Sequence, residues 1–255
     1  MNISVCTDML CPQLDTAEAV RSLAPLGVRY IEFWGWQNKD LTAIRDACRQ
    51  HGVQVAAICT AAFDLTDPAR RAEYLDGLRR SIPAAQQLAC PVLITQVGPD
   101  RGTSREEQHR SIAEGLTAAA QLLQGTGVTL AIEPLNLRVD HPGYYLSSSE
   151  EAFRLVHEVD RPEVRVLFDI YHQQVTEGDI LSHVLPNLDC IAHFHAAGCP
   201  GRHELESGEL AYPRLLRRIA DAGYTGRVGL EYAPVRADWT GLRADLAALA
   251  AVGLQ

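Results

Sequence analysis

Short apolar runs rich in β-branched residues alternate with longer amphipathic runs along the whole chain. The short runs lack a strict alternation of apolar and polar positions, which is typical of parallel strands buried on both faces. We predict eight strands, at residues 3–6, 28–34, 53–59, 91–97, 128–134, 164–170, 190–196 and 227–232. Helices are predicted between and after them, at 15–26, 40–51, 68–89, 104–124, 148–159, 179–185, 212–222 and 238–252.

One helix start carries a recognisable capping pattern. Ser148 stands three residues before Glu151 and directly before an apolar-periodic run. This spacing predicts a capping box, in which the serine and glutamate side chains each accept a hydrogen bond from the other's backbone N–H.

Eight strand–helix units in 255 residues match the usual size of a (β/α)8 barrel. A doubly wound open sheet is the competing architecture, but it normally has a glycine-rich turn after its first strand. The corresponding segment here, CTDMLCPQLD, contains no glycine. Since no linker or change of composition divides the chain, we predict a TIM barrel forming a single domain over residues 1–255.

Charge and composition exclude several classes of protein. The net charge is −9 and no run is rich in Lys or Arg, which argues against a nucleic-acid partner. The chain also lacks a secretory leader pattern and an apolar run of about 18 residues, so we expect a cytoplasmic protein that does not span a membrane. Seven cysteines without CxxC spacing are expected to be buried, free thiols.

Ionisable residues stand at the ends of four consecutive predicted strands. Glu133 ends the strand in GVTLAIEP, Asp169 the next, and His195 and Glu231 the last two. A single acid at a strand end is more often a helix cap or an arginine partner than a ligand. In a barrel, however, all four reach the same mouth, and three carboxylates with one imidazole suit Mg²⁺ or Mn²⁺. We therefore predict one bound divalent metal ion.

Nearby residues have more open interpretations. His193 precedes His195 by two positions; we expect the two side chains to face different ways and His193 to be structural. Glu32 lies near another strand end, beside Trp34 and Trp36. It either supports the site or forms a plain salt bridge, and the tryptophans are expected to wall the mouth.

Several segments carry a family resemblance over about residues 28–232. AIEPLN, FDIYHQQ, HFHAAGCPGRHELESGELAY, GRVGLEY and IEFWGWQNKDL resemble the hydroxypyruvate isomerase group of the xylose isomerase-like sugar isomerase and epimerase barrels. The resemblance implies that Glu133, Asp169, His195 and Glu231 bind one divalent metal, and that the two glutamates carry protons. One position departs from the pattern of the hydroxypyruvate isomerase group. The better-known hydroxypyruvate isomerases carry Gln where this chain has His195, whereas related ketose epimerases carry His.

The chemistry of the group suggests further roles. Aldose–ketose interconversion moves a proton between neighbouring carbons through an enediolate, so Glu133 and Glu231 are assigned as the acid–base pair. His172, in the predicted loop after the sixth strand, is expected to reach a substrate oxygen; the alternative is a solvent-facing histidine. Arg202 is the candidate for gripping a substrate carboxylate, and otherwise a surface arginine.

The loop that holds Arg202 also constrains the substrate. His203 either braces this loop or contacts substrate, and Trp34 contributes a pocket wall. Because the loop has one arginine and no lysine, we expect an unphosphorylated sugar acid as the small-molecule partner.

The leading hypothesis is an isomerase that converts hydroxypyruvate to tartronate semialdehyde, or acts on a four-carbon analogue. The alternatives are a ketose 3-epimerase, an apurinic endonuclease of the same barrel fold, and a binding protein without turnover. A homo-oligomer that buries the YHQQ segment at residues 171–174 is also considered.

Overall fold

The computed structural model describes residues 1–254 and places eight parallel strands in a closed barrel. Gln255, the last residue of the predicted domain, lies outside the described residues. The strands are β1 (Asn2–Cys6), β2 (Tyr30–Phe33), β3 (Gln54–Cys59), β4 (Val92–Thr95), β5 (Thr129–Ile132), β6 (Val164–Asp169), β7 (Ile191–Ala196) and β8 (Arg227–Leu230). All eight predicted strands are thus present, several of them shorter by one to three residues.

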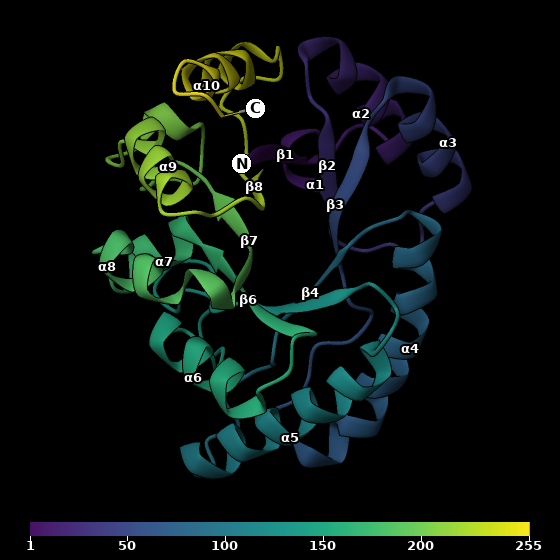
Figure 1. Cartoon of the computed structure of the whole chain (residues 1–255), viewed down its shortest axis with the longest axis vertical. Coiled ribbons are helices and arrows are strands. Elements are labelled where there is room, and N and C mark those ends of the chain that lie inside the picture. The colour runs from purple at the N-terminus through teal and green to yellow at the C-terminus, as the bar shows by residue number, and fades with distance from the viewer. Residues whose placement is uncertain (255) are drawn as a thin grey trace.

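The helices lie outside the strands and cover the barrel (Figure 1). They are α1 (Thr7–Leu10), α2 (Thr16–Leu23), α3 (Leu41–His51), α4 (Arg71–Gln87), α5 (Arg105–Leu123), α6 (Ser149–Val159), α7 (Ile170–Thr176), α8 (Ile180–Val184), α9 (Tyr212–Asp221) and α10 (Thr240–Ala250). Each strand pairs with its neighbours in chain order, and β8 closes the ring against β1. The (β/α)8 barrel prediction is confirmed.

Two short helices, α1 and α7, were not predicted. Each begins at the residue directly after a strand, so no loop residues separate the strand pattern from the helix. The start of α7 is fixed by Asp169, whose Oδ1 accepts hydrogen bonds from the backbone N–H groups of Tyr171 (2.7 Å) and His172 (3.2 Å). Asp169 is therefore a strand end and a helix N-cap at once.

The predicted capping box at Ser148 is wrong. Ser148 precedes α6, but its side chain makes no capping hydrogen bond. Glu177, at the end of α7, accepts the backbone N–H of Ser149 (3.0 Å) and the Ser148 hydroxyl (3.4 Å) instead. Glu151 is drawn away to Tyr145 and Arg105.

The barrel interior is divided between an apolar and a polar side. Strands β3 to β6 contribute a small inner cluster of apolar side chains, namely Ala57, Cys59, Val92, Ile94, Ala131 and Leu167. Strands β1, β2 and β7 contribute Ser4, Glu32, His193 and His195, all at most 2% exposed. These four side chains lie on one side of the barrel, and buried Asp169, at the end of β6, adjoins them at His195.

Other sequence expectations can be compared with this fold. All seven cysteines are free and buried, as predicted. Within residues 1–254, no helix combines the length and the apolar character needed to cross a membrane. In the YHQQ segment, Tyr171, His172 and Gln173 are buried inside the chain, so they offer no surface to a second subunit.

Candidate metal and substrate site

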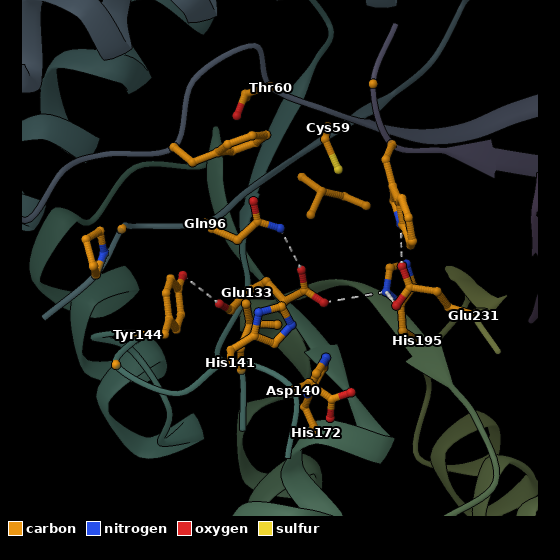
Figure 2. Close-up of a pocket in the computed structure, with 18 of the residues that line it drawn as sticks. Cys59, Thr60, Gln96, Glu133, Asp140, His141, Tyr144, His172, His195 and Glu231 are labelled. Atoms are coloured by element: carbon orange, nitrogen blue, oxygen red, sulfur yellow. Dashed lines mark hydrogen bonds and ion pairs between the residues drawn. The ribbon is translucent and has the colours of Figure 1, made fainter. Parts of the chain in front are cut away.

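A cavity of about 800 Å³ opens at the carboxyl ends of the strands (Figure 2). Its floor includes Glu133, His195 and Glu231, and its walls come largely from the loops that follow β2 to β5. Trp34 and Phe63 stand at its rim, where 42% and 41% of their surfaces remain exposed. The cavity thus joins a buried, charged floor to an open and more apolar mouth.

Four predicted residues converge at the floor of this cavity, and all but Asp169 are among the residues that line it. One potential ligand atom from each of Glu133, Asp169, His195 and Glu231 lies within 4.8 Å of the others. Glu133 and Glu231 directly follow β5 and β8, while Asp169 and His195 lie at or near the ends of β6 and β7. None is more than 4% exposed, so their charges are removed from bulk water.

His195 is surrounded by carboxylates. Its Nδ1 lies 3.3 Å from Glu231 Oε2 and 3.6 Å from Glu133 Oε1, and its Nε2 lies 3.0 Å from Glu32 Oε1. Burial alone lowers the pKa of His195, but Glu231 and Glu32 outweigh burial and raise the pKa well above its usual value. In this arrangement the imidazole supplies positive charge to an acidic floor.

Glu231 has further donors of its own. The indole Nε1–H of Trp34 donates to Oε1 at 2.7 Å, and the Arg202 guanidinium donates to Oε2. Burial raises the pKa of Glu231, but His195, Arg202 and Trp34 together hold it well below the usual value. Asp169 differs, since burial outweighs its more distant contact with Arg202 (3.6 Å) and raises its pKa.

The donor set fits a divalent cation. Three carboxylates and one imidazole converge, and both ring nitrogens of His195 are buried without a hydrogen-bond partner that meets normal geometry. Hard cations such as Mg²⁺ and Mn²⁺ prefer oxygen-rich sets of this kind. Closely packed, buried carboxylates repel one another, and a cation among them offsets that repulsion.

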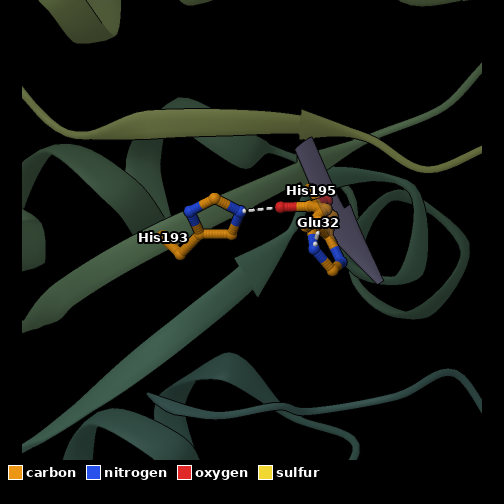
Figure 3. A group of neighbouring side chains, drawn as sticks. All are labelled: Glu32, His193 and His195. Carbon is orange, nitrogen blue, oxygen red and sulfur yellow. Dashed lines mark hydrogen bonds and ion pairs between the residues drawn. The ribbon is translucent and has the colours of Figure 1, made fainter. Parts of the chain in front are cut away.

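His193 and His195 face the same way, contrary to our expectation. Residues two apart on a strand share a face, and both side chains contact Glu32 inside the barrel (Figure 3). The buried contact of Glu32 with His195 favours the supporting role over a plain salt bridge. Burial raises the pKa of Glu32, but His195 and His193 outweigh it and lower the pKa to about 2.

His172 lies on α7, not in a loop, and lines the cavity. Its Nδ1 lies 3.3 Å from the backbone N–H of Asn136, which donates to it, so the neutral ring carries its proton on Nε2. That Nε2 is buried and has no hydrogen-bond partner. Burial, with Arg202 nearby, lowers the pKa of His172 to about 4, which leaves a neutral donor beside the cavity.

Arg202 is not a surface arginine. Its side chain is 15% exposed and contacts Glu231, Asp169 and Asp140, while its guanidinium lies over the ring of Tyr171. A backbone φ of 56° in the loop after β7 turns the residue toward the cavity. Among the described residues that line the cavity, Arg202 is the only Lys or Arg.

The two remaining predicted residues are placed differently. Trp34 lines the cavity, as expected for a pocket wall, but Trp36 is not among the lining residues. His203 does not line the cavity either, and its Nδ1 contacts the backbone carbonyl of Ala233 at 2.7 Å. This contact favours the bracing role that we considered for His203.

Sequence reasoning missed several cavity residues. Gln96 directly follows the β4 region and donates to Glu133 Oε2 (3.3 Å), and Tyr144 donates to the Glu133 carbonyl (3.2 Å). Asn136 holds His172. Because Gln96 stands at a strand end, its position in the sequence could have indicated a cavity residue. Tyr144 lies in a loop eleven residues beyond Glu133, where no sequence pattern indicates such a role.

Comparison with known proteins defines the class first. The family model described as xylose isomerase-like TIM barrel matches residues 20–252, and the chain belongs to that family. Within it, the chain is 32% identical over 244 residues to 2-oxo-tetronate isomerase from Haemophilus influenzae, covering 91% of this chain and 92% of that protein. It is 29% identical over 252 residues to hydroxypyruvate isomerase from Escherichia coli, with 95% and 97% covered.

Solved structures agree on the fold. The crystal structure of an AP endonuclease, family 2, from Brucella melitensis superposes with a TM-score of 0.90 at 29% identity, covering 95% of this chain and 97% of that one. D-psicose 3-epimerase from Clostridium cellulolyticum superposes with a TM-score of 0.81 at 19% identity, covering 99% and 98%. The epimerase likeness shows the shared barrel alone.

Proposed function

We propose that this protein is a metal-dependent isomerase of a short oxo sugar acid, with hydroxypyruvate or a four-carbon 2-oxo acid as substrate. The observation that carries this proposal is the pairing of Glu133 and Glu231 with a single arginine at one cavity floor. The hydroxypyruvate and 2-oxo-tetronate isomerases among its relatives support the same reaction class.

Glu133, Asp169, His195 and Glu231 would hold one divalent cation, for which Mg²⁺ and Mn²⁺ are the best candidates. When bound, such an ion polarises the substrate carbonyl and stabilises negative charge that develops on oxygen. The neighbouring protein groups then decide how the substrate lies and where its protons go.

Glu133 and Glu231 are proposed to move the protons. With hydroxypyruvate, one carboxylate removes a proton from C3, the hydroxymethyl carbon, to give an enediolate. A proton returned to C2, together with transfer of the hydroxyl proton from O3 to O2, gives tartronate semialdehyde with no net change of atoms. Because the two groups share one buried site, their protonation belongs to the pair rather than to either residue.

Arg202, His172 and Trp34 are proposed to orient the substrate. A guanidinium can hold a substrate carboxylate with two parallel hydrogen bonds, and Arg202 is the one Lys or Arg among the described residues that line the cavity. The buried Nε2–H of His172 has no hydrogen-bond partner, with Asp169 Oδ2 3.6 Å away, and is available to a substrate oxygen. Trp34 holds Glu231 and walls the same end of the cavity.

Ketose 3-epimerisation is the second candidate, since the same glutamates could exchange a proton at C3 of a free ketose. The structural resemblance to D-psicose 3-epimerase is confined to the fold. Arg202 favours the acid, because a neutral ketose has no group that requires a buried arginine.

Steady-state assays with Mg²⁺ or Mn²⁺ separate these candidates. We expect kcat/KM for hydroxypyruvate or 2-oxo-tetronate to exceed that for a free ketohexose by at least about 100-fold, as the loss of one buried charged contact implies. The Arg202→Lys variant should raise KM for the acid, while Arg214→Lys, on α9, serves as a control. Preference for the ketohexose would contradict the proposal.

A further inference from the structure

Glu32 is a buried carboxylate without a role in the proposed proton transfer. It lies on β2 and is 2% exposed. Its Oε2 contacts the hydroxyl of Ser4 (3.1 Å) and Nε2 of His193 (2.7 Å), as a hydrogen-bond acceptor. Its Oε1 has one polar contact among the described residues, Nε2 of His195 at 3.0 Å (Figure 3).

The barrel leaves space for this carboxylate at Gly229. In β8, Gly229 pairs in register with Ser4 on one side and His195 on the other. A Cβ added at Gly229 would lie 1.9 Å from Glu32 Oε1, so a larger residue would displace the carboxylate. The backbone around Glu32 is thus shaped to keep Oε1 against His195.

The two nitrogens of the His195 ring contact different carboxylates. Nε2 faces Glu32, while Nδ1 faces Glu133 and Glu231 at the cavity floor. An ionised carboxylate only accepts hydrogen bonds. If His195 gives up its Nδ1 proton to bind a cation at the floor, its remaining proton stays on Nε2 against Glu32, and the lone pair of Nδ1 points at the floor.

We propose that Glu32, braced by His193 and Ser4, is a positioning residue that fixes the ring orientation and tautomer of His195 for metal binding. This inference rests on the proposed metal site. A carboxylate or carbonyl behind a metal-binding histidine is a general device, and its loss typically weakens metal binding roughly 10- to 100-fold.

Mn²⁺ affinity, measured by titration calorimetry, tests this role without relying on turnover. Glu32→Gln should weaken binding roughly 10- to 100-fold, whereas Glu206→Gln, at an exposed glutamate outside the site, should change it less than about threefold. In a His195→Gln background, the Glu32→Gln substitution should have little further effect, because Glu32 acts through His195.

Three outcomes would overturn the inference. One is unchanged Mn²⁺ affinity in Glu32→Gln, and another is an equal loss in both backgrounds, which indicates a general structural role. The third is binding of two Mn²⁺ ions by the wild type with one lost in Glu32→Gln, since Glu32 would then be a ligand itself.

The wild type offers a second measurement that needs no stable variant at position 32. In ¹⁵N-histidine-labelled, Mg²⁺-loaded protein, NMR should show the His195 proton on Nε2; a proton on Nδ1 would contradict the inference. Turnover enters neither test. If the wild type is an active isomerase but Glu32→Gln binds Mn²⁺ as tightly as the wild type, only the inference about Glu32 is refuted. If Mn²⁺ binding depends on Glu32 but the wild type has no isomerase activity, only the proposed reaction is refuted.

Discussion

Glu133 and Glu231 occupy equivalent strand ends but are held by different neighbours. Gln96 donates to Glu133, whereas Trp34 and Arg202 donate to Glu231. Replacing either glutamate by glutamine keeps the shape of the side chain but removes the carboxylate that would accept and return the proton. We expect kcat to fall by about 10²- to 10⁴-fold in Glu133→Gln and in Glu231→Gln, with unchanged circular dichroism.

Exposed Glu206, in the loop after β7, provides a matched control for both variants. Glu206→Gln should keep the wild-type rate. Near-wild-type kcat in either cavity variant would remove that glutamate from proton transfer.

The indole hydrogen bond to Glu231 can be tested separately. Trp34→Phe keeps an aromatic wall but removes the donor that lies 2.7 Å from Glu231 Oε1. A hydrogen bond to a charged group contributes about 1.5–3 kcal/mol, so kcat/KM should fall roughly 10- to 100-fold. An equal kcat/KM in the variant would mean that Trp34 serves as a wall alone.

The sequence predicts which residues lie at the site better than it predicts their hydrogen-bond partners. The four floor residues could be predicted because position along a parallel strand fixes the end of the barrel at which a side chain lies. The partners of each group could not, since Trp34 and Glu231 are 197 positions apart in the chain. The orientation expected for His193 was wrong because residues two apart on a strand share a face, and the structural role expected for it stays a prediction.

At the scale of elements, α6 and α7 depend on each other through Glu177. This side chain caps α6 from the end of α7, in the place where Ser148 was expected to act. Glu177→Ala should lower the free energy of unfolding by about 0.5–2 kcal/mol, as for other lost helix caps. Urea unfolding measures this change.

Glu150→Ala, in the exposed first turn of the same helix, is the control for Glu177→Ala and should have a smaller effect. If both variants unfold at the same urea concentration, Glu177 does not stabilise α6. The sequence could not reveal this cap, because the acceptor comes from a different helix.

The long helices were predicted, and so was the short helix α8, which lies within the predicted range 179–185, whereas the short helices α1 and α7 were not. The long helices α4 and α5 lie within the predicted ranges 68–89 and 104–124. Helix α7 begins at Ile170, inside the predicted strand 164–170, and its N-cap Asp169 is also the last residue of β6, so the apolar run of the strand hides the start of the helix. The sequence therefore predicts a loop at His172, although the residue lies on α7. Its position at the cavity is still compatible with the contact to a substrate oxygen that we expected.

At the scale of the whole molecule, a buried carboxylate that does not line the cavity links stability to pH. Asp245 in α10 is 2% exposed and accepts the backbone N–H of Leu205 at 3.1 Å. Burial outweighs that hydrogen bond and raises the pKa of Asp245 from 3.8 to about 6. Between these values the folded chain binds more protons than the unfolded chain, so the contribution of Asp245 to stability decreases as pH rises.

Asp245→Asn keeps an acceptor for Leu205 and removes the buried charge. The variant should be more stable than the wild type at pH 7.5, by at most about 3 kcal/mol, and this difference should shrink by roughly half at pH 5. Urea unfolding at the two pH values measures the change. A difference independent of pH would show that Asp245 does not titrate as described.

The central claim is proton transfer at a carbon of a small oxo acid, and hydrogen exchange tests it most directly. A ¹H NMR time course in D₂O would follow hydroxypyruvate with Mg²⁺-loaded protein, and in parallel a four-carbon 2-oxo acid and a free ketohexose. We predict enzyme-dependent deuterium incorporation beside the carbonyl of an acid substrate, with net isomerisation, and its loss in EDTA and in Glu133→Gln. Absence of exchange with both acids, or exchange confined to the ketohexose, would contradict the account.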